Sequence, residues 1–152
     1  MILTKQCYDK LAQQLYVLNH DEIPAAARYM EECRQSGSLD DNPEYYAALQ
    51  ALDRLNKKAD DLSETLKSAT IFSSSMAEKD VVGFGTTVEF ENCETNKRKK
   101  YTLVSIYDSD LENGLISIES PFAKEMIGLK VGDFFTFNDA DYEIISICFS
   151  SL

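Results

Sequence analysis

The stretch GSLDDNPEYYAA, residues 37–48, lies between two long segments that have the periodicity of helices. It places two adjacent aspartates, Asp40 and Asp41, and the further acid Glu44 within five residues. Neighbouring carboxylates repel one another, and a bend between two helices needs only one good capping residue. The excess of acids therefore raises the question of what this bend does besides joining two helices.

Apolar residues on both sides of the bend recur at the spacing of one helical face. They are Leu11, Leu15, Leu18, Ala26, Met30 and Cys33 before it, and Tyr45, Leu49, Leu52, Leu55, Leu62, Leu66 and Ala69 after it. Thr4 is placed to cap the first helix, and Asn42 followed by Pro43 forms a good cap and first turn for the second. Each helix is predicted to span about 25–32 residues, or roughly 40–48 Å. Two such stripes joined by a short bend predict an antiparallel helical hairpin.

Two features qualify this hairpin. Pro24 falls inside the first helix and is expected to kink it or to open a local break, because proline cannot donate a backbone hydrogen bond. A hairpin of this length, with a single apolar seam, buries little core for its size. Such a shape indicates an element that reaches a target at a distance.

The second half of the chain obeys a different pattern. Beyond a polar linker at residues 74–80, short runs rich in β-branched and aromatic residues alternate with Gly, Asn and Asp. The segment SPFAKEMIG between two of these runs predicts a short helix, with Ser120 as its cap and Pro121 at its first position. We expect a compact, bent antiparallel sheet with a core that includes Val88, Leu103, Ile106, Ile116, Ile118, Phe135 and Ile145.

The predicted fold class is therefore α+β. Residues 1–73 are assigned to the helical hairpin with its acidic tip at 37–45, residues 74–80 to the linker, and residues 81–152 to the sheet domain with one short helix. A length of 152 residues fits two small domains.

The net charge restricts the partners of the protein. The chain carries 26 acids and 15 bases, a formal charge of −11, so its surface repels free nucleic acid and anionic lipid. Nucleic acid must then be reached through a partner protein. The four widely spaced cysteines form no CxxC pair and indicate reduced thiols in a cytosolic protein. No apolar run approaches the ~20 residues of a membrane span and the start lacks a signal-peptide pattern, so no membrane contact and a cytoplasmic location are expected.

The motifs resemble one known family over nearly the whole chain. LTKQCYDKLAQQLYVL (residues 3–18) is similar to the opening of the bacterial transcript-cleavage factors GreA and GreB. GSLDDNPEYYAA is similar to their hairpin tip, which usually reads G-D-L-x-E-N-A-E-Y-x-A-A. Three further segments, at residues 82–90, 107–133 and 142–149, resemble their C-terminal domain. The combination and its order carry the resemblance rather than any single motif.

The resemblance implies a fold and a mode of action. The C-terminal domain is expected to have an FKBP-like fold and to dock at the rim of the secondary channel of bacterial RNA polymerase, while the hairpin reaches the polymerase active site. There the tip acids help to hold a Mg²⁺ ion and to orient a water molecule, so that the polymerase cuts the 3′ end of backtracked RNA. Two-metal hydrolysis of a phosphodiester uses ions about 3.5–4 Å apart, and Mg²⁺ prefers carboxylate oxygens.

The protein is accordingly expected to be a regulator rather than an enzyme. It would complete the polymerase active site, share Mg²⁺ with the polymerase without a cofactor of its own, and meet nascent RNA only inside the polymerase. His20 stands alone on a helix, without a nucleophile beside it, and an FKBP-like fold does not imply prolyl isomerase activity. The resemblance favours a monomer.

Site residues follow from aligning the tip motif. The second tip acid of the family, normally Glu, falls on Asp41, which is therefore the candidate ligand of the shared Mg²⁺. Asp40 and Glu44 are the other candidate catalytic acids. Asn42 and Tyr45 are candidate contacts with the polymerase. The alternative is that Asp40, Asp41 and Asn42 form only a solvated turn and a helix cap.

One tip position departs from the family. Its first tip acid, normally Asp, falls on Ser38, and a neutral hydroxyl is a much poorer Mg²⁺ ligand than a carboxylate. Ser38 is therefore assigned to the polymerase contact, and a second hypothesis stays open: a channel binder that inhibits or modulates the polymerase without stimulating cleavage. A third is a Gre-like protein adapted to another partner. In the C-terminal domain, Glu119, Ser120 and Pro121 match the loop that meets the polymerase rim, and the same residues suit an ordinary helix cap.

Overall fold

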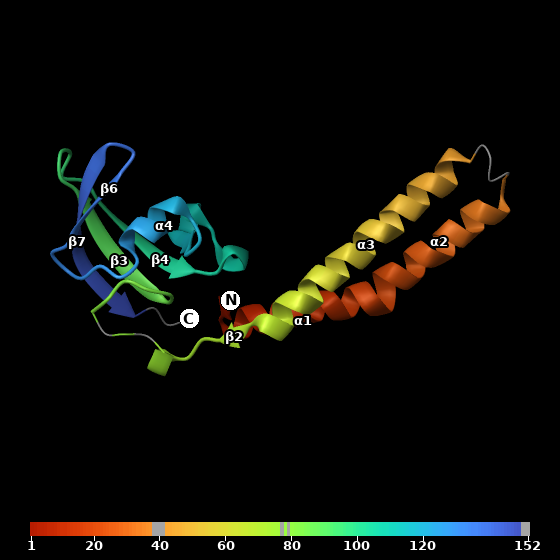
Figure 1. Cartoon of the computed structure of the whole chain (residues 1–152), viewed down its shortest axis with the longest axis horizontal. Coiled ribbons are helices and arrows are strands. Elements are labelled where there is room, and N and C mark those ends of the chain that lie inside the picture. The colour runs from red at the N-terminus through yellow and green to blue at the C-terminus, as the bar shows by residue number, and fades with distance from the viewer. Residues whose placement is uncertain (38–41, 77, 79, 150–152) are drawn as a thin grey trace. The chain divides into compact units, whose positions relative to one another are not determined.

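The computed structural model describes residues 1–37, 42–76, 78 and 80–149. The chain forms two compact units, of which the first is Tyr8–Thr70 with Met1, and the second is Ile2–Cys7 with the chain from Ile71 onward. The helical elements of the first half are α1 (Lys5–Val17), a π-helical turn (Leu18–Glu22), α2 (Ile23–Gln35) and α3 (Pro43–Ser68). Figure 1 shows α2 and α3 side by side, as the arms of a hairpin.

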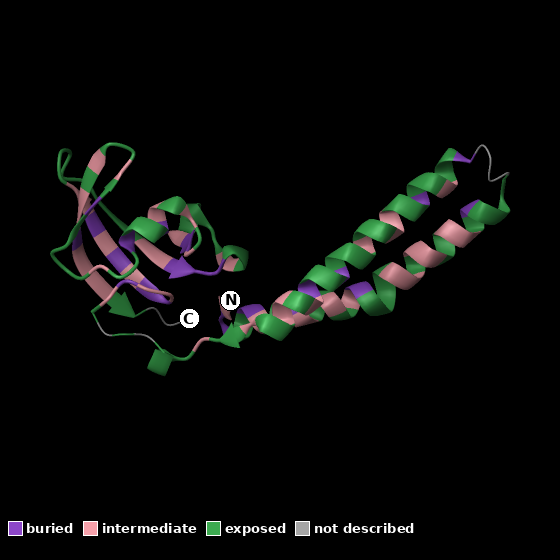
Figure 2. Ribbon diagram, viewed as in Figure 1, coloured by how far each residue is buried: buried purple, intermediate pink, exposed green. Residues whose placement is uncertain are grey.

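The predicted helical hairpin is confirmed. Thr4 caps α1 by accepting a hydrogen bond from the backbone N–H of Cys7 at 3.0 Å, and α3 extends for 26 residues, about 39 Å. Its apolar seam is thin, and most of α2 and α3 is half-buried or exposed (Figure 2). The buried seam positions are Leu11, Leu18, Cys33, Ala48, Ala59 and Leu62. None of the described helices has both the length and the apolar character that a membrane crossing requires.

Pro24 changes the winding of the first arm without ending it. The five residues before α2, Leu18–Glu22, form a π-helical turn in which the N–H of Ile23 bonds the carbonyl of Leu18. Proline removes one backbone donor from the helical ladder, and a π turn is one way in which a helix absorbs that loss. The ring of His20 adds support: its Nδ1 donates to the Tyr16 carbonyl at 2.9 Å, and the two rings stack at 4.0 Å. The local break expected at Pro24 is therefore this single wide turn.

The second unit is built on a five-stranded sheet. Its strands have the order β5-β4-β3-β7-β6, and a separate two-stranded sheet pairs β1 with β2. The bounds are β1 (Ile2–Leu3), β2 (Thr70–Ile71), β3 (Thr86–Asn92), β4 (Arg98–Val104), β5 (Leu115–Ser117), β6 (Phe134–Phe137) and β7 (Ala140–Phe149), with the short helix α4 (Pro121–Met126).

The sheet is mixed rather than wholly antiparallel. β3 pairs antiparallel with β4 and β7, and β6 with β7, as predicted, but β5 runs parallel to β4. The reason lies in the connection between the two strands, residues 105–114, which contains two short 3₁₀ turns. It returns the chain from the end of β4 to a point beside Thr102, so that β5 starts there and runs in the same direction as β4. A hairpin turn would have reversed the direction instead.

The core lies on one face of this sheet, beneath α4, whose Ala123 and Met126 are fully buried. Its members are Val82, Val88, Phe90, Leu103, Ile116, Ala123, Met126, Phe135 and Ile144, with Ile118 packed against them. Two predicted core residues are wrong. Ile106 is 53% exposed because β4 ends at Val104 and Ile106 begins a 3₁₀ turn.

Ile145, the other wrong core assignment, is displaced by a β-bulge. Glu89 pairs with Ser146, whereas the next residue, Phe90, pairs with Ile144, so Ile145 is the additional residue on β7. Because a bulge inserts one additional residue, the alternation of core-facing and outward-facing residues shifts by one along the strand beyond the bulge. Ile144 is therefore fully buried and Ile145 only half-buried.

This register predicts unequal costs for two adjacent substitutions. Ile144→Ala should lower the free energy of unfolding by about 2–5 kcal/mol, because it leaves a cavity in the core. Ile145→Ala should cost about 1 kcal/mol, in proportion to its partial burial. Urea unfolding, followed by near-ultraviolet circular dichroism of the aromatic side chains, measures both. Equal costs, or a larger cost at Ile145, would contradict the bulge.

Candidate functional site

The carboxamide of Asn42 joins the two arms of the hairpin at its tip. Its Oδ1 accepts a hydrogen bond from the N–H of Tyr45 at 3.1 Å, which caps α3. Its Nδ2 donates to the carbonyl of Cys33, in the last turn of α2, at 2.8 Å. The first N–H groups and the last carbonyls of helices have no partners within the helix. One buried side chain thus satisfies such a group on each arm.

Gly37 makes room for this contact. A β-carbon at position 37 would lie 3.3 Å from Nδ2 of Asn42, closer than such atoms usually approach. Ser36 satisfies carbonyl groups at the end of α2, just before Gly37. The N–H of Ser36 donates to the Glu32 carbonyl, and the hydroxyl of Ser36 donates to the Cys33 carbonyl. Gly37 and Asn42 together form a clamp, which we call the tip clamp.

The segment that the tip clamp brackets contains three of the predicted site residues. Ser38, Asp40 and Asp41 lie outside the described residues, so their assignments stay predictions. The structure describes the residues on either side of them, Gly37 and Asn42.

The described side of the tip places the other candidates. Glu44 is exposed in the first turn of α3, where the partial positive charge of a helix N-terminus favours an acid. Tyr45 is half-buried, whereas Tyr46 is 51% exposed, and their rings meet edge to face at 5.5 Å between centroids. Packing across the seam is thus a role for Tyr45 and not for Tyr46. The Asn42 side chain, a candidate polymerase contact, is engaged within the hairpin.

Tyr29 is a neighbour of the tip that the sequence did not single out. Its side chain lines a shallow hollow with Glu44, and its pKa is raised, first by its hydrogen bond with the Cys33 side chain and also by negative charge that includes Glu44. The spacing of four residues between Tyr29 and Cys33 was the available signal, because such residues share a helical face.

Arg34, a basic residue near the tip, is engaged by an acid. Arg34 forms a salt bridge with Glu31 one turn earlier. The pKa of Glu31 is lowered, chiefly by this hydrogen bond, and the pKa of Arg34 is raised by it. Both groups are solvent-exposed, so the pair contributes little to stability. It does reduce the positive charge that Arg34 can offer to RNA.

A second candidate site is the loop that enters α4. Ser120 caps this helix by accepting from the N–H of Ala123 at 3.2 Å, and Pro121 occupies its first turn. The N–H of Glu119 donates to the Ser117 hydroxyl at 3.2 Å. The Glu119 carboxylate is exposed and has no ion-pair partner among the described residues. The loop is thus held rigid by its own hydrogen bonds while it presents an acid and a proline to solvent.

The donor chemistry of the tip fits a hard cation such as Mg²⁺. Carboxylates at Asp40, Asp41 and Glu44 are the oxygen ligands that this ion prefers. In the described part of the chain, no three His, Cys, Asp or Glu side chains are grouped closely enough to hold a metal ion. Asp110, in the second unit, accepts from the Asn113 amide at 2.6 Å and directly precedes the 3₁₀ turn Leu111–Asn113.

Comparison with known protein families covers both halves of the chain. Residues 1–71 match the family described as "Transcription elongation factor, N-terminal", and residues 77–148 match "Transcription elongation factor, GreA/GreB, C-term". The chain belongs to the GreA/GreB family.

Individual Gre relatives are similar over almost their entire length. Transcription elongation factor GreA of Nautilia profundicola is 32% identical over 154 residues, which cover 99% of this chain and 95% of the relative. GreA of Thermodesulfovibrio yellowstonii is 34% identical over 151 residues, with 97% and 96% covered. Among solved structures, Gfh1 of Thermus aquaticus is 30% identical, covers 97% of both chains and gives a TM-score of 0.45.

In this Gre protein, two letters of the tip motif thus have a structural explanation. Asn42 bridges the helices, and Gly37 gives it space. The candidate metal-binding positions of the motif lie between these two residues. One of them is Ser38, where the motif of the family usually has Asp.

The tip clamp predicts distinct effects for two substitutions. Asn42→Ala should destabilise the hairpin by about 1–3 kcal/mol and expose the Tyr45 N–H, because it removes both hydrogen bonds. Asn42→Asp should keep the cap, and with it the protection of the Tyr45 N–H, while losing the bond to Cys33. Amide hydrogen exchange of Tyr45 checks the first step, and urea unfolding followed by far-ultraviolet circular dichroism checks the cost. If the Tyr45 amide exchanges equally fast in both variants, the oxygen of residue 42 does not cap α3 independently of the bond to Cys33.

Proposed function

We propose that this Gre-family protein enters the secondary channel of bacterial RNA polymerase and stimulates the polymerase's own Mg²⁺-dependent cleavage of backtracked RNA 3′ ends. The observation that carries the proposal is the tip clamp. The buried amide of Asn42 bonds the last turn of α2 and the first turn of α3, the two helices between which Asp40 and Asp41 lie in the sequence. Positioned groups contribute to catalysis in proportion to how well their geometry is fixed.

The role of each tip residue follows from its chemistry. Asp41 provides a carboxylate oxygen for a Mg²⁺ site that the polymerase completes, while Asp40 and Glu44 add negative charge beside it. When bound, the ion would stabilise charge on the phosphate and lower the pKa of a water molecule. Asn42 orients the segment and does not take part in the chemistry. The RNA is met only within the polymerase, as a surface of net charge −11 requires.

Binding to the polymerase is assigned to the loop that enters α4. Glu119 and Pro121 are exposed on a helix start that Ser120 fixes. An exposed, unpaired acid on a rigid loop suits a basic partner surface, which supports the proposed contact with the rim of the channel. The protein acts as a monomer in this proposal.

The second candidate function is a channel binder that does not stimulate cleavage. Ser38, at the position of the family's first tip acid, favours it, because it removes one carboxylate from the site. Pro43 replaces the usual alanine at the start of α3 and restrains the tip further.

An RNA cleavage assay distinguishes the two functions. With a bacterial polymerase stalled in a backtracked complex and Mg²⁺ present, the wild-type protein should shorten the RNA and allow synthesis to restart. Asp41→Ala should reduce the cleavage rate by about 100-fold or more and leave binding unchanged, since a metal ligand is lost. Asp60→Ala, which removes an exposed acid in the middle of α3, is the matched control and should cleave normally.

Two results of that assay would count against the proposal. Full cleavage by Asp41→Ala would remove Asp41 from the metal site. Unchanged RNA and slowed synthesis with the wild-type protein would establish the inhibitor instead. In the cleavage mechanism Ser38→Asp should raise the rate, and no gain would mean that position 38 is not a weakened ligand.

Reversing the charge of the docking loop tests the polymerase contact. Glu119→Lys should weaken binding to the polymerase about tenfold, because it places a cation against a basic surface. Glu125→Lys, an exposed acid on α4 itself, makes the same change of net charge and should bind normally. Competition for the polymerase against a labelled wild-type protein gives both affinities. Equal affinities of the two variants would remove Glu119 from the interface.

A further inference from the structure

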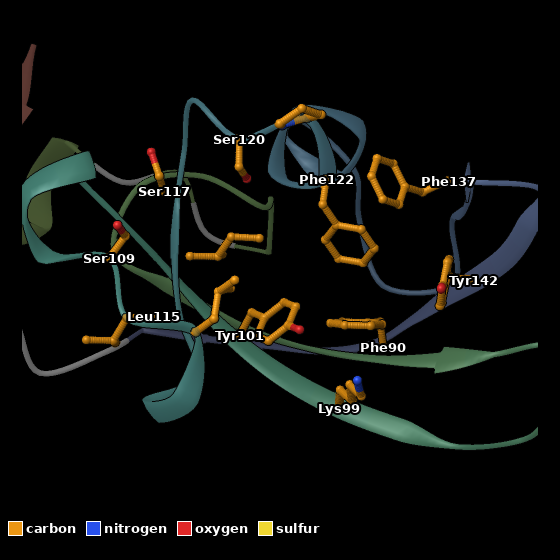
Figure 3. Close-up of a pocket in the computed structure, with 13 residues that line it drawn as sticks. Phe90, Lys99, Tyr101, Ser109, Leu115, Ser117, Ser120, Phe122, Phe137 and Tyr142 are labelled. Atoms are coloured by element: carbon orange, nitrogen blue, oxygen red, sulfur yellow. The ribbon is translucent and has the colours of Figure 1, made fainter.

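The second unit contains a pocket of about 400 Å³ that the tip and its proposed chemistry do not use. This volume lies within the usual range for small-molecule sites. Mostly apolar atoms line it, from β3, β4, β5, β6, β7, the loop before β5 and the start of α4 (Figure 3). The lining residues that matter are Phe90, Lys99, Tyr101, Ser117, Phe122 and Tyr142.

One end of the pocket is a preformed aromatic wall. Figure 3 shows the ring of Phe122 directed toward Phe90, with Tyr101 to one side and Tyr142 to the other. The centroids of these three rings lie 5.2, 5.8 and 5.6 Å from that of Phe122. Each pair is tilted or edge to face, the arrangements that aromatic rings favour. The wall is therefore rigid, and an apolar group can bind it without first ordering it.

The polar atoms of the pocket offer hydrogen-bond donors. The hydroxyls of Tyr101 and Tyr142 have no hydrogen-bond partner among the described residues. The hydroxyl oxygens of Ser117 and Ser120 accept from the N–H groups of Glu119 and Ala123, which leaves their own hydrogens available. A ligand that carries acceptor oxygens is complementary to this set.

Lys99 supplies the charge of the pocket. It lies directly opposite Phe90 across β3 and β4, on the pocket side of the sheet. Its neighbours Arg98 and Lys100 pair with Glu89 and Glu91 on the other face, whereas Lys99 has no ion-pair partner among the described residues. The thirteen lining residues include no acid, on a chain whose net charge is −11.

We propose that this pocket binds an apolar acid: an aromatic or branched aliphatic body seated against the aromatic wall, with a carboxylate held by Lys99 and the hydroxyl donors. The apolar lining supplies affinity, and the unpaired cation supplies the preference for an anion over a neutral molecule of the same shape.

The pocket shares Ser120 and Pro121 with the loop assigned to the polymerase contact. A bound ligand should therefore compete with that contact, a consequence that rests on the proposed function. Ligand binding does not depend on the proposed function and is measured on the protein alone. Failure of the pocket proposal can therefore be told apart from failure of the proposed function.

The test compares two probes that share one body and carry either an anionic carboxylate or a neutral amide. 3-Phenylpropionate and 3-phenylpropanamide have the same body, and titration of each into the full chain, followed by the amide resonances in two-dimensional NMR spectra, gives their affinities. The carboxylate should bind about fivefold more tightly and shift the resonances of the lining residues. Lys99→Gln should abolish this preference and leave the affinity for the amide unchanged.

Lys97→Gln is the matched control. It removes an exposed lysine in the loop just before β4, outside the pocket lining, and the preference for the carboxylate should persist. The proposal is overturned by equal affinities of the two probes in the wild-type protein, by a preference that survives Lys99→Gln, by resonance shifts outside the pocket, or by no binding of either probe. Lys99 is exposed, so the variant should keep the wild-type spectrum elsewhere.

Discussion

Helix ends leave backbone groups without partners, and the hairpin tip depends on how one side chain meets that need at two helix ends at once. The carboxamide of Asn42 accepts from Tyr45 at the start of α3 and donates to Cys33 at the end of α2. The seam between the arms is thin, so packing alone gives the tip little support. A buried amide with both functions engaged is costly to remove, because the Tyr45 N–H would lose its cap and the Cys33 carbonyl would keep only its bond from the Ser36 hydroxyl. The tip clamp therefore ties Asn42, the described residue that follows positions 38–41, to the ends of both helices.

The two units divide the work in the proposed function. The hairpin has little core and carries the candidate acids in the sequence of its tip, whereas the second unit has a core of its own and a rigid loop at Glu119–Pro121. In that function the chain needs no complete catalytic pocket, since the polymerase would supply the remainder. The aromatic pocket beside the loop adds a place where an apolar acid and the polymerase would meet the same residues.

Local features were predictable from the sequence, and features that depend on pairing between distant segments were not. The caps at Thr4, Asn42 and Ser120 were correct because a cap is decided within four residues. Ile145 was misplaced because a bulge arises from the register between β3 and β7, which no local pattern contains. The second bond of Asn42, to Cys33, spans nine residues and was missed for the same reason. Asp40 and Asp41 were chosen through the family motif, and their roles stay predictions.

The link between the tip clamp and the proposed chemistry is tested by the rate of RNA cleavage in a backtracked complex with Asn42→Ala, measured together with the affinity for the polymerase. Asn42 takes no part in the chemistry, yet a displacement of about 1 Å can cost roughly 100-fold in rate. We expect cleavage to fall at least tenfold while the affinity, set by the loop at Glu119, stays within about twofold of wild type. Cleavage at the wild-type rate with the clamp removed would contradict this expectation.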